Sequence, residues 1–447
     1  MSTIRDDSIS KVQIRQFSED YKSRKLNIIL TNAAAKSGIN AVAYNNDVPA
    51  RAKHKFSLEL DTMKVTHQKS SGRCWMFAGL NLIRERIAKK CNIEQFELSQ
   101  NYQTFWDKFE KANYFLECIL ETLDEPVEGR LVTWLLQNAC VDGGQWDMFV
   151  NLIDKYGVVP KDAMPETHNS SNTSLMNQLV TVKLRKCAIE LRNHASGNEG
   201  PDNLRKAKYG MLREIYTLLC IFLGEPPTGF DFEYKDKDKV FHSDRGLTPD
   251  VFFSRYADLN LHDYVSIIHA PTLDKPLNRT FTVRFLGNVK GGRDVFYVNM
   301  DIDIMKNVAL AQLQDHEPVW FGCDVGKMLD KELGVMDADL YRYDLALDMS
   351  FDLAKSERLD YRESCMTHAM VFTGVNLVDG KPNRWKVENS WGEEHGDKGY
   401  YVMTDKWFEE YMYQVVVNRK YLSEAMLKLL AQKLIVLEPW DPMGSLA

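Results

Sequence analysis

The spacing of hydrophobic residues predicts helices in the first half of the chain. Between residues 74 and 91 the apolar positions recur every three to four residues, which is the period of an amphipathic α-helix. A second such pattern covers residues 145–156 and stops at Gly157, a residue that commonly ends a helix. Further helical spacing is found in residues 8–25 and, as two helices, in residues 175–223.

The second half of the chain shows the pattern of β-strands instead. Residues 279–300 alternate apolar and polar positions on both sides of Gly291-Gly292, which is typical of a β-hairpin. The segments EPVWFG, THAMVFTGV and RWKVENSW are also predicted as strands. Residues 225–275 are polar and interpreted as rich in loops, with the run YKDKDK as a solvated surface. Helices followed by strands indicate an α+β fold with a cleft between two lobes.

The composition is that of an ordinary globular protein without a secretory signal. The 447 residues are 44% hydrophobic and 27% charged, which suits about three structural units. No uncharged apolar run approaches about 18 residues, so no membrane partner is expected. The eight cysteines are scattered without a CxxC pair, which favours a reduced, cytoplasmic protein. A net charge of −7 weakens a nucleic-acid-binding role without excluding a local basic patch.

The stretch HQKSSGRCWMFAGL, residues 67–80, has the features of a nucleophile site. Cys74 lies where a loop enters a helix, and the unpaired N–H groups and dipole of such a helix start stabilise a thiolate. Gln68, six residues earlier, is placed to supply an amide donor beside the backbone N–H of Cys74. Two donors aimed at one developing oxyanion are what acyl transfer requires.

A cysteine nucleophile also needs a base, and the base needs a group that orients it. His368 stands at the head of one predicted strand and Asn389 at the end of the next, so the two side chains can face each other. The Asn389 carboxamide oxygen would hold the tautomer of His368, and Trp391 would cover their hydrogen bond. We expect an imidazolium beside a Cys74 thiolate, since such pairing lowers a thiol pKa from about 8.5 to about 3–4.

Taken singly, each of these residues has a simpler explanation. Cys74 fits a packed helix residue, His368 fits a core histidine that makes its hydrogen bonds, and Asn389 fits a turn. Their occurrence together, in this order and each in an elaborate local context, is what indicates a catalytic site.

The pattern resembles the papain superfamily of cysteine peptidases and, within it, the bleomycin hydrolase and aminopeptidase C family. The blocks that carry the resemblance are KSSGRCW, DGGQWDM, PVWFGCDVGK, THAM, ENSWGE, KGY and PWDPMGSLA, and they run from about residue 60 to the end of the chain. The resemblance implies a two-lobe papain-like fold with a Cys74, His368 and Asn389 triad, an oxyanion hole of Gln68 and the Cys74 amide, and a substrate ledge at Gly143 and Gly144.

The chain departs from ordinary papain-like enzymes in two respects. Those enzymes carry a structural cysteine three positions before the nucleophile, whereas Ser71 stands here, so that disulfide cannot form. His368 follows Cys74 by roughly 300 residues rather than by the ~130–150 of the secreted enzymes. About 150 extra residues are therefore expected between the lobes. In the resembled family such insertions build a hexameric ring.

The resemblance also divides the chain. The C-terminal tail of the chain is expected to enter the cleft. The Ala447 carboxylate would bind the substrate's α-ammonium there, and the tail would restrict cleavage to the first peptide bond. The expected parts are a helical extension (1–60), a helical lobe (61–200), a hook-like region for oligomerisation (201–275), a β lobe (276–435) and the tail (436–447).

The sequence thus predicts a cytosolic cysteine aminopeptidase, acting as a homohexamer on peptides or aminoacyl amides without a metal or organic cofactor. By resemblance, bleomycin-type amides and homocysteine thiolactone are further substrates. A metallo-aminopeptidase is disfavoured because HExxH is absent, and KGGRD lacks the phosphate-loop pattern. The alternative is a ring-shaped nucleic-acid-binding or scaffold protein on a peptidase fold, which the complete set of Cys74, His368 and Asn389 argues against.

Overall fold

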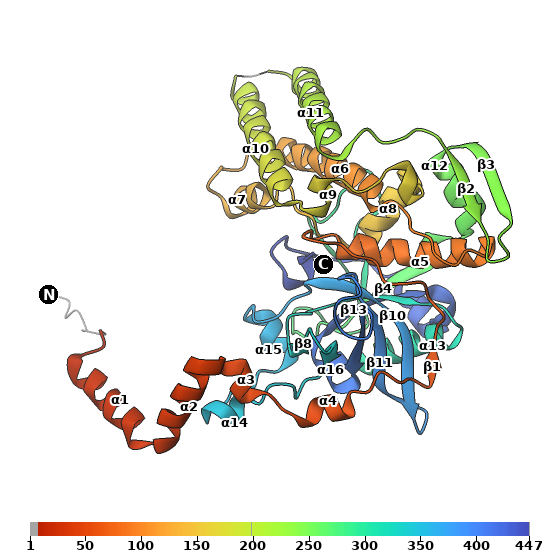
Figure 1. Ribbon diagram of the computed structural model, residues 1–447. Coiled ribbons are helices and arrows are strands. Elements are labelled where there is room, and N and C mark those ends of the chain that lie inside the picture. Colours follow the sequence, from red (N-terminus) through yellow and green to blue (C-terminus); the bar gives the residue numbers. More distant parts are fainter. Residues whose placement is uncertain (1–7, 198, 447) are drawn as a thin grey trace.

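The computed structural model describes residues 8–197 and 199–446, in which a helical lobe packs on a β lobe (Figure 1). The α+β class predicted from the sequence is confirmed. Both lobes contribute large buried aromatic side chains to their contact. Trp146 from a helix lies with its ring centroid 6.1 Å from that of Trp320, a strand residue, and the Trp320 indole N–H donates to the backbone oxygen of Trp75 at 3.1 Å.

The helical lobe contains the helices that the hydrophobic spacing predicts. The pattern at 74–91 is α5 (Cys74–Cys91), and the pattern at 145–156 is α8 (Trp146–Tyr156), which ends at Gly157. The two long helices are α10 (Ser174–Ser196) and α11 (Pro201–Leu223). Both pack on α6 (Gln100–Glu121) because each buries one apolar stripe at helical spacing.

The other helical elements are shorter. They are α1 (Lys11–Ser23), α2 (Lys25–Ser37), α3 (Ile39–Ala43), α4 (Asp47–Arg51), α7 (Arg130–Gln137), α9 (His168–Ser171), α12 (Pro249–Phe252), α13 (Ile302–Gln314), α14 (Tyr343–Leu347), α15 (Lys355–Asp360), α16 (Asp405–Tyr411) and α17 (Glu424–Leu429), with single turns at Lys161–Ala163, Phe253–Ala257, Leu261–Asp263, Arg419–Tyr421 and η5 (Pro442–Gly444).

The β lobe is built on one mixed sheet that brings distant segments together. Its order is β14-β5-β6-β4-β13-β7-β10-β11-β12-β9-β8, with β1 also paired to β10. The strands are β1 (Leu58–Glu59), β4 (Tyr264–Ile268), β5 (Arg279–Val283), β6 (Tyr297–Asn299), β7 (Val319–Cys323), β8 (Leu329–Asp330), β9 (Val335–Met336), β10 (His368–Val378), β11 (Lys381–Glu388), β12 (Tyr400–Thr404), β13 (Met412–Asn418) and β14 (Ile435–Leu437). The three strands predicted from EPVWFG, THAMVFTGV and RWKVENSW are confirmed as β7, β10 and β11.

The hairpin predicted at Gly291-Gly292 is only partly correct. Strands β5 and β6 do pair antiparallel, with Arg279 opposite Asn299, but residues 284–296 join them as a long loop. Gly291 still lies in a turn, with φ +81° and a bond from the Gly292 N–H to Val289 O at 3.1 Å, but this turn does not join the two strands directly. Gly292 serves a close approach, because a Cβ on it would lie 2.8 Å from the Asn151 side chain. The alternation of apolar and polar residues predicted that β5 and β6 pair. It did not predict the course of the loop between them, which packs against Asn151 of the remote helix α8.

The prediction that residues 225–275 are rich in loops is wrong in part. A second, two-stranded sheet of β2 (Phe230–Lys235) and β3 (Phe241–Leu247) lies there, and β4 is a strand of the main sheet. The hairpin buries Phe232 on one face and carries charged side chains on the other. The segment is therefore polar on average, and for this reason it was interpreted as loops. The YKDKDK run forms the exposed end of this hairpin, as expected.

The N-terminal helices α1 and α2 extend away from both lobes (Figure 1). Neither helix contains a buried residue, although both carry large apolar side chains. No helix in the described part of the chain is both long enough and apolar enough to span a membrane. The proposed division of the chain into five parts remains a prediction.

Candidate active site

Cys74 lies at the contact between the two lobes. It is the first residue of α5 and only 2% exposed. The backbone N–H groups of Ala369, of Trp75 and of Cys74 itself point at its sulfur. Because Ala369 directly follows His368 on β10, the sulfur is placed beside the strand end that carries this histidine.

His368 and Asn389 face each other from neighbouring strands. His368 Nε2 lies 2.9 Å from Asn389 Oδ1, and the backbone N–H of Ser390 donates to the same oxygen at 2.8 Å. An oxygen that accepts both bonds requires the proton on Nε2, which leaves Nδ1 as the basic nitrogen. The Trp391 ring lies 4.9 Å from the His368 ring, tilted by 39°, and its expected role of covering the hydrogen bond to Asn389 stays a prediction.

Burial acts on the two catalytic candidates in opposite directions. It raises the pKa of the Cys74 thiol to about 11, against the lowering effect of the three backbone N–H groups. It lowers the pKa of His368 to about 4, against the raising effect of the hydrogen bond to Asn389. Both directions favour the neutral thiol and imidazole, whereas the sequence led us to expect the ion pair. The helix start and the asparagine act as expected, but desolvation outweighs them.

Gln68 is fixed next to the catalytic candidates by Ser390. The side-chain oxygen of Gln68 accepts from the Ser390 hydroxyl at 2.6 Å, and the Gln68 backbone N–H donates to Ser390 O at 2.8 Å. Its Nε2 donates one hydrogen to Ser71 O at 2.5 Å. An amide nitrogen carries two hydrogens, so one remains for another acceptor.

The two glycines of the expected ledge are held by the helical lobe. A Cβ on Gly144 would lie 2.5 Å from the Trp75 ring, so only glycine fits this close approach. The backbone oxygen of Gly143 accepts from Lys111 Nζ at 2.7 Å, and the Trp75 indole N–H donates to Asp142 O at 2.8 Å. This segment therefore has a fixed course beside the helix that begins with Cys74.

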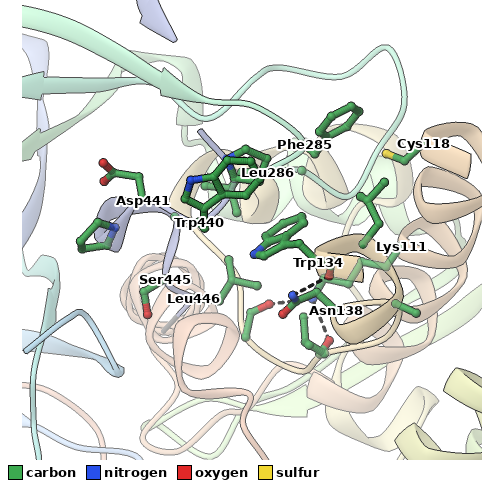
Figure 2. A pocket seen from close by; sticks show the side chains of 18 of the residues that line it. Lys111, Cys118, Trp134, Asn138, Phe285, Leu286, Trp440, Asp441, Ser445 and Leu446 are labelled. Atoms are coloured by element: carbon green, nitrogen blue, oxygen red, sulfur yellow. Dashed lines mark hydrogen bonds between the residues drawn. The ribbon is translucent and has the colours of Figure 1, made fainter. Parts of the chain in front are cut away.

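A cavity of about 640 Å³ opens beside the ledge (Figure 2). Its walls come from α6, α7, the loop at 285–287, Gly143 and the C-terminal tail from Pro439 to Leu446. Figure 2 shows the tail residues Trp440 and Leu446 near Trp134 of α7. Tail residues and Gly143 thus line the same cavity, while Ala447 lies outside the described residues and the role of the tail stays a prediction.

Several supporting residues were not singled out from the sequence. Ser390 and Arg73 stand inside the quoted motifs, but only the structure shows their partners. Arg73 is 1% exposed and makes two hydrogen bonds to Glu166, at 2.8 and 3.1 Å. Lys111 had no local signal, because the backbone oxygens that it binds come from a separate segment. Among residues 8–197 and 199–446, no group of three metal-ligating side chains is positioned to hold an ion.

A cysteine at a helix start and a histidine oriented by an asparagine on the next strand, between a helical and a β lobe, define a papain-like cysteine peptidase. The sequence model of the Peptidase C1-like family matches residues 8–444, so the chain belongs to this family. The resemblance to aminopeptidase C and bleomycin hydrolase is confirmed by the relatives described next, and so is the expected enzyme class, a cysteine-type aminopeptidase.

The relatives match nearly the whole chain. Aminopeptidase C of Listeria innocua is 47% identical over 97% of this chain and 98% of that protein. Bleomycin hydrolase of Mus musculus is 45% identical over 86% of each. The crystal structure of PepW from Lactobacillus rhamnosis HN001 superposes with a TM-score of 0.97 at 50% identity, covering 99% of this chain and all of that one.

Proposed function

We propose that the protein removes N-terminal residues from peptides and aminoacyl amides through a Cys74, His368 and Asn389 triad. The observation that carries this proposal is the 2.9 Å contact between His368 Nε2 and Asn389 Oδ1 beside the buried start of α5. It leaves His368 Nδ1 as the base, on the strand end where the Cys74 sulfur lies. A nucleophile, a base and an orienting group are then present in the order that acyl transfer requires.

The proposed reaction has two halves. His368 Nδ1 takes the thiol proton as the Cys74 sulfur attacks the carbonyl carbon, and Gln68 Nε2–H and the Cys74 N–H donate to the oxyanion. The C–N bond then breaks, and His368 gives its proton to the leaving amine. A water attacks the resulting thioester while His368 takes its proton. The C–S bond breaks, the sulfur recovers a proton, and the amino acid leaves.

The two pKa shifts suit a pair that shares one proton. With a pKa of about 4, His368 is an unprotonated base at neutral pH, and with a pKa of about 11, Cys74 retains its proton until it attacks. Whether that proton rests on sulfur or on nitrogen, the pair carries one proton across this range. The thiolate is needed only while the nucleophile attacks, when the oxyanion donors already hold the substrate.

The proposed restriction to the first peptide bond rests on the tail. A papain-like cleft that is open at both ends would cut internal bonds, whereas a segment at the ledge blocks the non-primed side. Ser445 and Leu446 line the cavity together with Gly143. A carboxylate on Ala447 would follow directly and would attract the substrate's α-ammonium.

The same chemistry extends to other substrates with a free α-amine. Bleomycin-type amides present an amide bond next to a free α-amine. Homocysteine thiolactone presents an acyl–sulfur bond that a thiolate can exchange. Both come to the proposal through the bleomycin hydrolase relatives. Neither substrate requires a group other than the triad, the two oxyanion donors and the tail.

We further propose a cytoplasmic homohexamer. Self-association would cover the apolar side chains of the N-terminal helices, of which Val12, Ile14 and Phe17 are 54–72% exposed. The number of subunits and the hook-like role of residues 201–275 rest on the family resemblance. Sedimentation of the purified full chain tests the assembly.

The activity is tested with an aminoacyl reporter and its N-acetylated twin, each assayed before and after treatment with iodoacetamide. The proposal expects hydrolysis of the free-amine form only, abolished by alkylation and absent in Cys74→Ser, which retains the thermal stability of the wild type. Activity that survives in Cys74→Ser, or that a chelator removes, would overturn the proposal.

A further inference from the structure

The C-terminal tail is held by a buried ion pair that the reaction does not use. Lys275 has a side chain only 1% exposed, and its Nζ lies 2.9 Å from Asp441 Oδ2 of the tail. Lys275 also pairs with its neighbour Asp274, whose carboxylate is 60% exposed and does not contact the tail. A buried lysine needs a carboxylate partner, and here the buried partner is the tail residue.

Asp441 also shapes the turn that follows it. Its other oxygen, Oδ1, accepts from the Met443 backbone N–H at 2.8 Å, and its backbone oxygen accepts from the Gly444 N–H at 2.9 Å. The same carboxylate therefore binds the β lobe through Lys275 and starts the turn η5. This one side chain therefore links the start of the turn to the β lobe.

Within the turn and after it, further contacts hold the tail along the cleft. Met443 is 2% exposed, and its backbone oxygen accepts from the Tyr297 hydroxyl at 3.2 Å. Ser445 Oγ donates to Met366 O at 2.6 Å, and Ser445 O accepts from Gln145 Nε2 at 2.7 Å. Gln145 directly follows the ledge glycines, so the last contact lies at the substrate-binding edge of the cleft.

The opposite side of the tail faces the cavity. Trp440 lies under the guanidinium of Arg130, 3.9 Å from ring centroid to Cζ, and lines the cavity with Leu286 and Trp134 (Figure 2). The buried attachments therefore come from the β lobe and the ledge, and the cavity side offers few. A tail released from Lys275 has room to move into this cavity.

We propose that the Lys275–Asp441 pair is the positioning device that keeps the tail across the cleft and so limits the enzyme to free amino termini. This inference rests on the proposed aminopeptidase function and deepens it. Neither residue contacts the reacting atoms. They act by fixing the position of the tail. If the tail is out of the cleft for part of the time, N-blocked or longer substrates can bind in proportion to that time.

Two substitutions test the pair, with a matched control. Asp441→Asn keeps an oxygen for the Met443 N–H but loses the ion pair, and Lys275→Met keeps the length of the side chain without its charge. Asp274→Asn removes the exposed partner of the same lysine. For each purified full-length variant, kcat/KM is measured on the free-amine reporter and on its N-acetylated twin, with thermal unfolding and limited proteolysis of the tail.

The ratio of acetylated to free-amine kcat/KM is expected to rise by about tenfold or more in Asp441→Asn and Lys275→Met, because breaking a buried pair shifts a local equilibrium at least that far. Asp274→Asn should stay within about twofold, as exposed pairs contribute little. The tail should become sensitive to protease only in the first two variants.

The outcomes separate this inference from the proposed function. A chain truncated before Met443 that cleaves blocked substrates, together with an unchanged ratio in both pair variants, would show that the tail is the wall but that Lys275 does not position it. A lower melting temperature with an unchanged ratio would reduce the pair to a structural role and also overturn the inference. Wild-type enzyme that cleaves both reporters equally would instead refute the proposed aminopeptidase restriction itself.

Discussion

Replacing Gln68 by alanine should separate oxyanion stabilisation from thiol reactivity. Gln68 has one amide hydrogen left after its 2.5 Å bond to Ser71 O, and its orientation is fixed by the 2.6 Å bond from the Ser390 hydroxyl. Loss of one preorganised oxyanion donor costs about 2.7–4 kcal/mol, which is a fall of about 10²–10³ in kcat. Since Gln68 is only 6% exposed, water does not readily replace it.

The assay compares two reactions of the same sulfur. Hydrolysis of a free-amine aminoacyl amide passes through an oxyanion, whereas alkylation by iodoacetamide does not. Gln68→Ala should therefore lose the 10²–10³ factor in hydrolysis, yet alkylate within about threefold of the wild type. Ser390→Ala is the matched control. This variant keeps the Gln68 amide donor but removes the hydrogen bond that the side-chain oxygen of Gln68 accepts. The loss of one hydrogen bond should lower hydrolysis by about tenfold at most.

Two results would refute this reasoning. Equal losses in hydrolysis and alkylation would mean that Gln68 supports the thiol or the fold instead of the oxyanion. Hydrolysis within about threefold of the wild type would mean that the Cys74 amide and other groups supply the stabilisation without it.

The pKa values of about 4 for His368 and about 11 for Cys74 predict a broad bell-shaped pH profile of kcat/KM, because the active pair carries one shared proton. The value of kcat/KM should fall below pH 4, where His368 becomes protonated, and above pH 11, where the shared proton is lost. Asn389→Ala removes the hydrogen bond that raises the pKa of His368, so the acid limb should move to lower pH while kcat falls; an acid limb that moves upward contradicts this sign. Gly144→Ala should lower the free energy of unfolding by about 1–3 kcal/mol in urea titration, because its Cβ meets the Trp75 ring. Gly210→Ala, with nothing within 4 Å in the exposed part of α11, should instead stabilise by about 0.5–1 kcal/mol, and equal effects would refute the packing argument.

Local pattern predicted the elements that carry the site because each is specified within about twenty residues. Helix α5 and strands β10 and β11 follow from apolar spacing, and the Asn389 and His368 contact follows from two adjacent strands. The pKa of Cys74 did not follow, because the helix start is a local feature whereas burial results from the packing of both lobes.

Long-range contacts between polar side chains remained hidden for the same reason. Lys275 and Asp441 belong to separate parts of the chain, and neither has a pattern that marks it as buried. Ser390 was visible only as one letter of a motif, although it holds Gln68 in place. Residues 225–275 looked like loops because the buried positions of that hairpin alternate with charges. A local sequence pattern does not specify such pairs.

The central claim is that Cys74 forms the covalent intermediate. The most direct test is to mix the enzyme with a free-amine aminoacyl ester, quench in acid during turnover and map the modified peptide by mass spectrometry. The account predicts one acyl group per active site, on the peptide that contains Cys74, and none with the N-acetylated ester. Turnover without an acyl group on Cys74, or an acyl group on another residue, would contradict it.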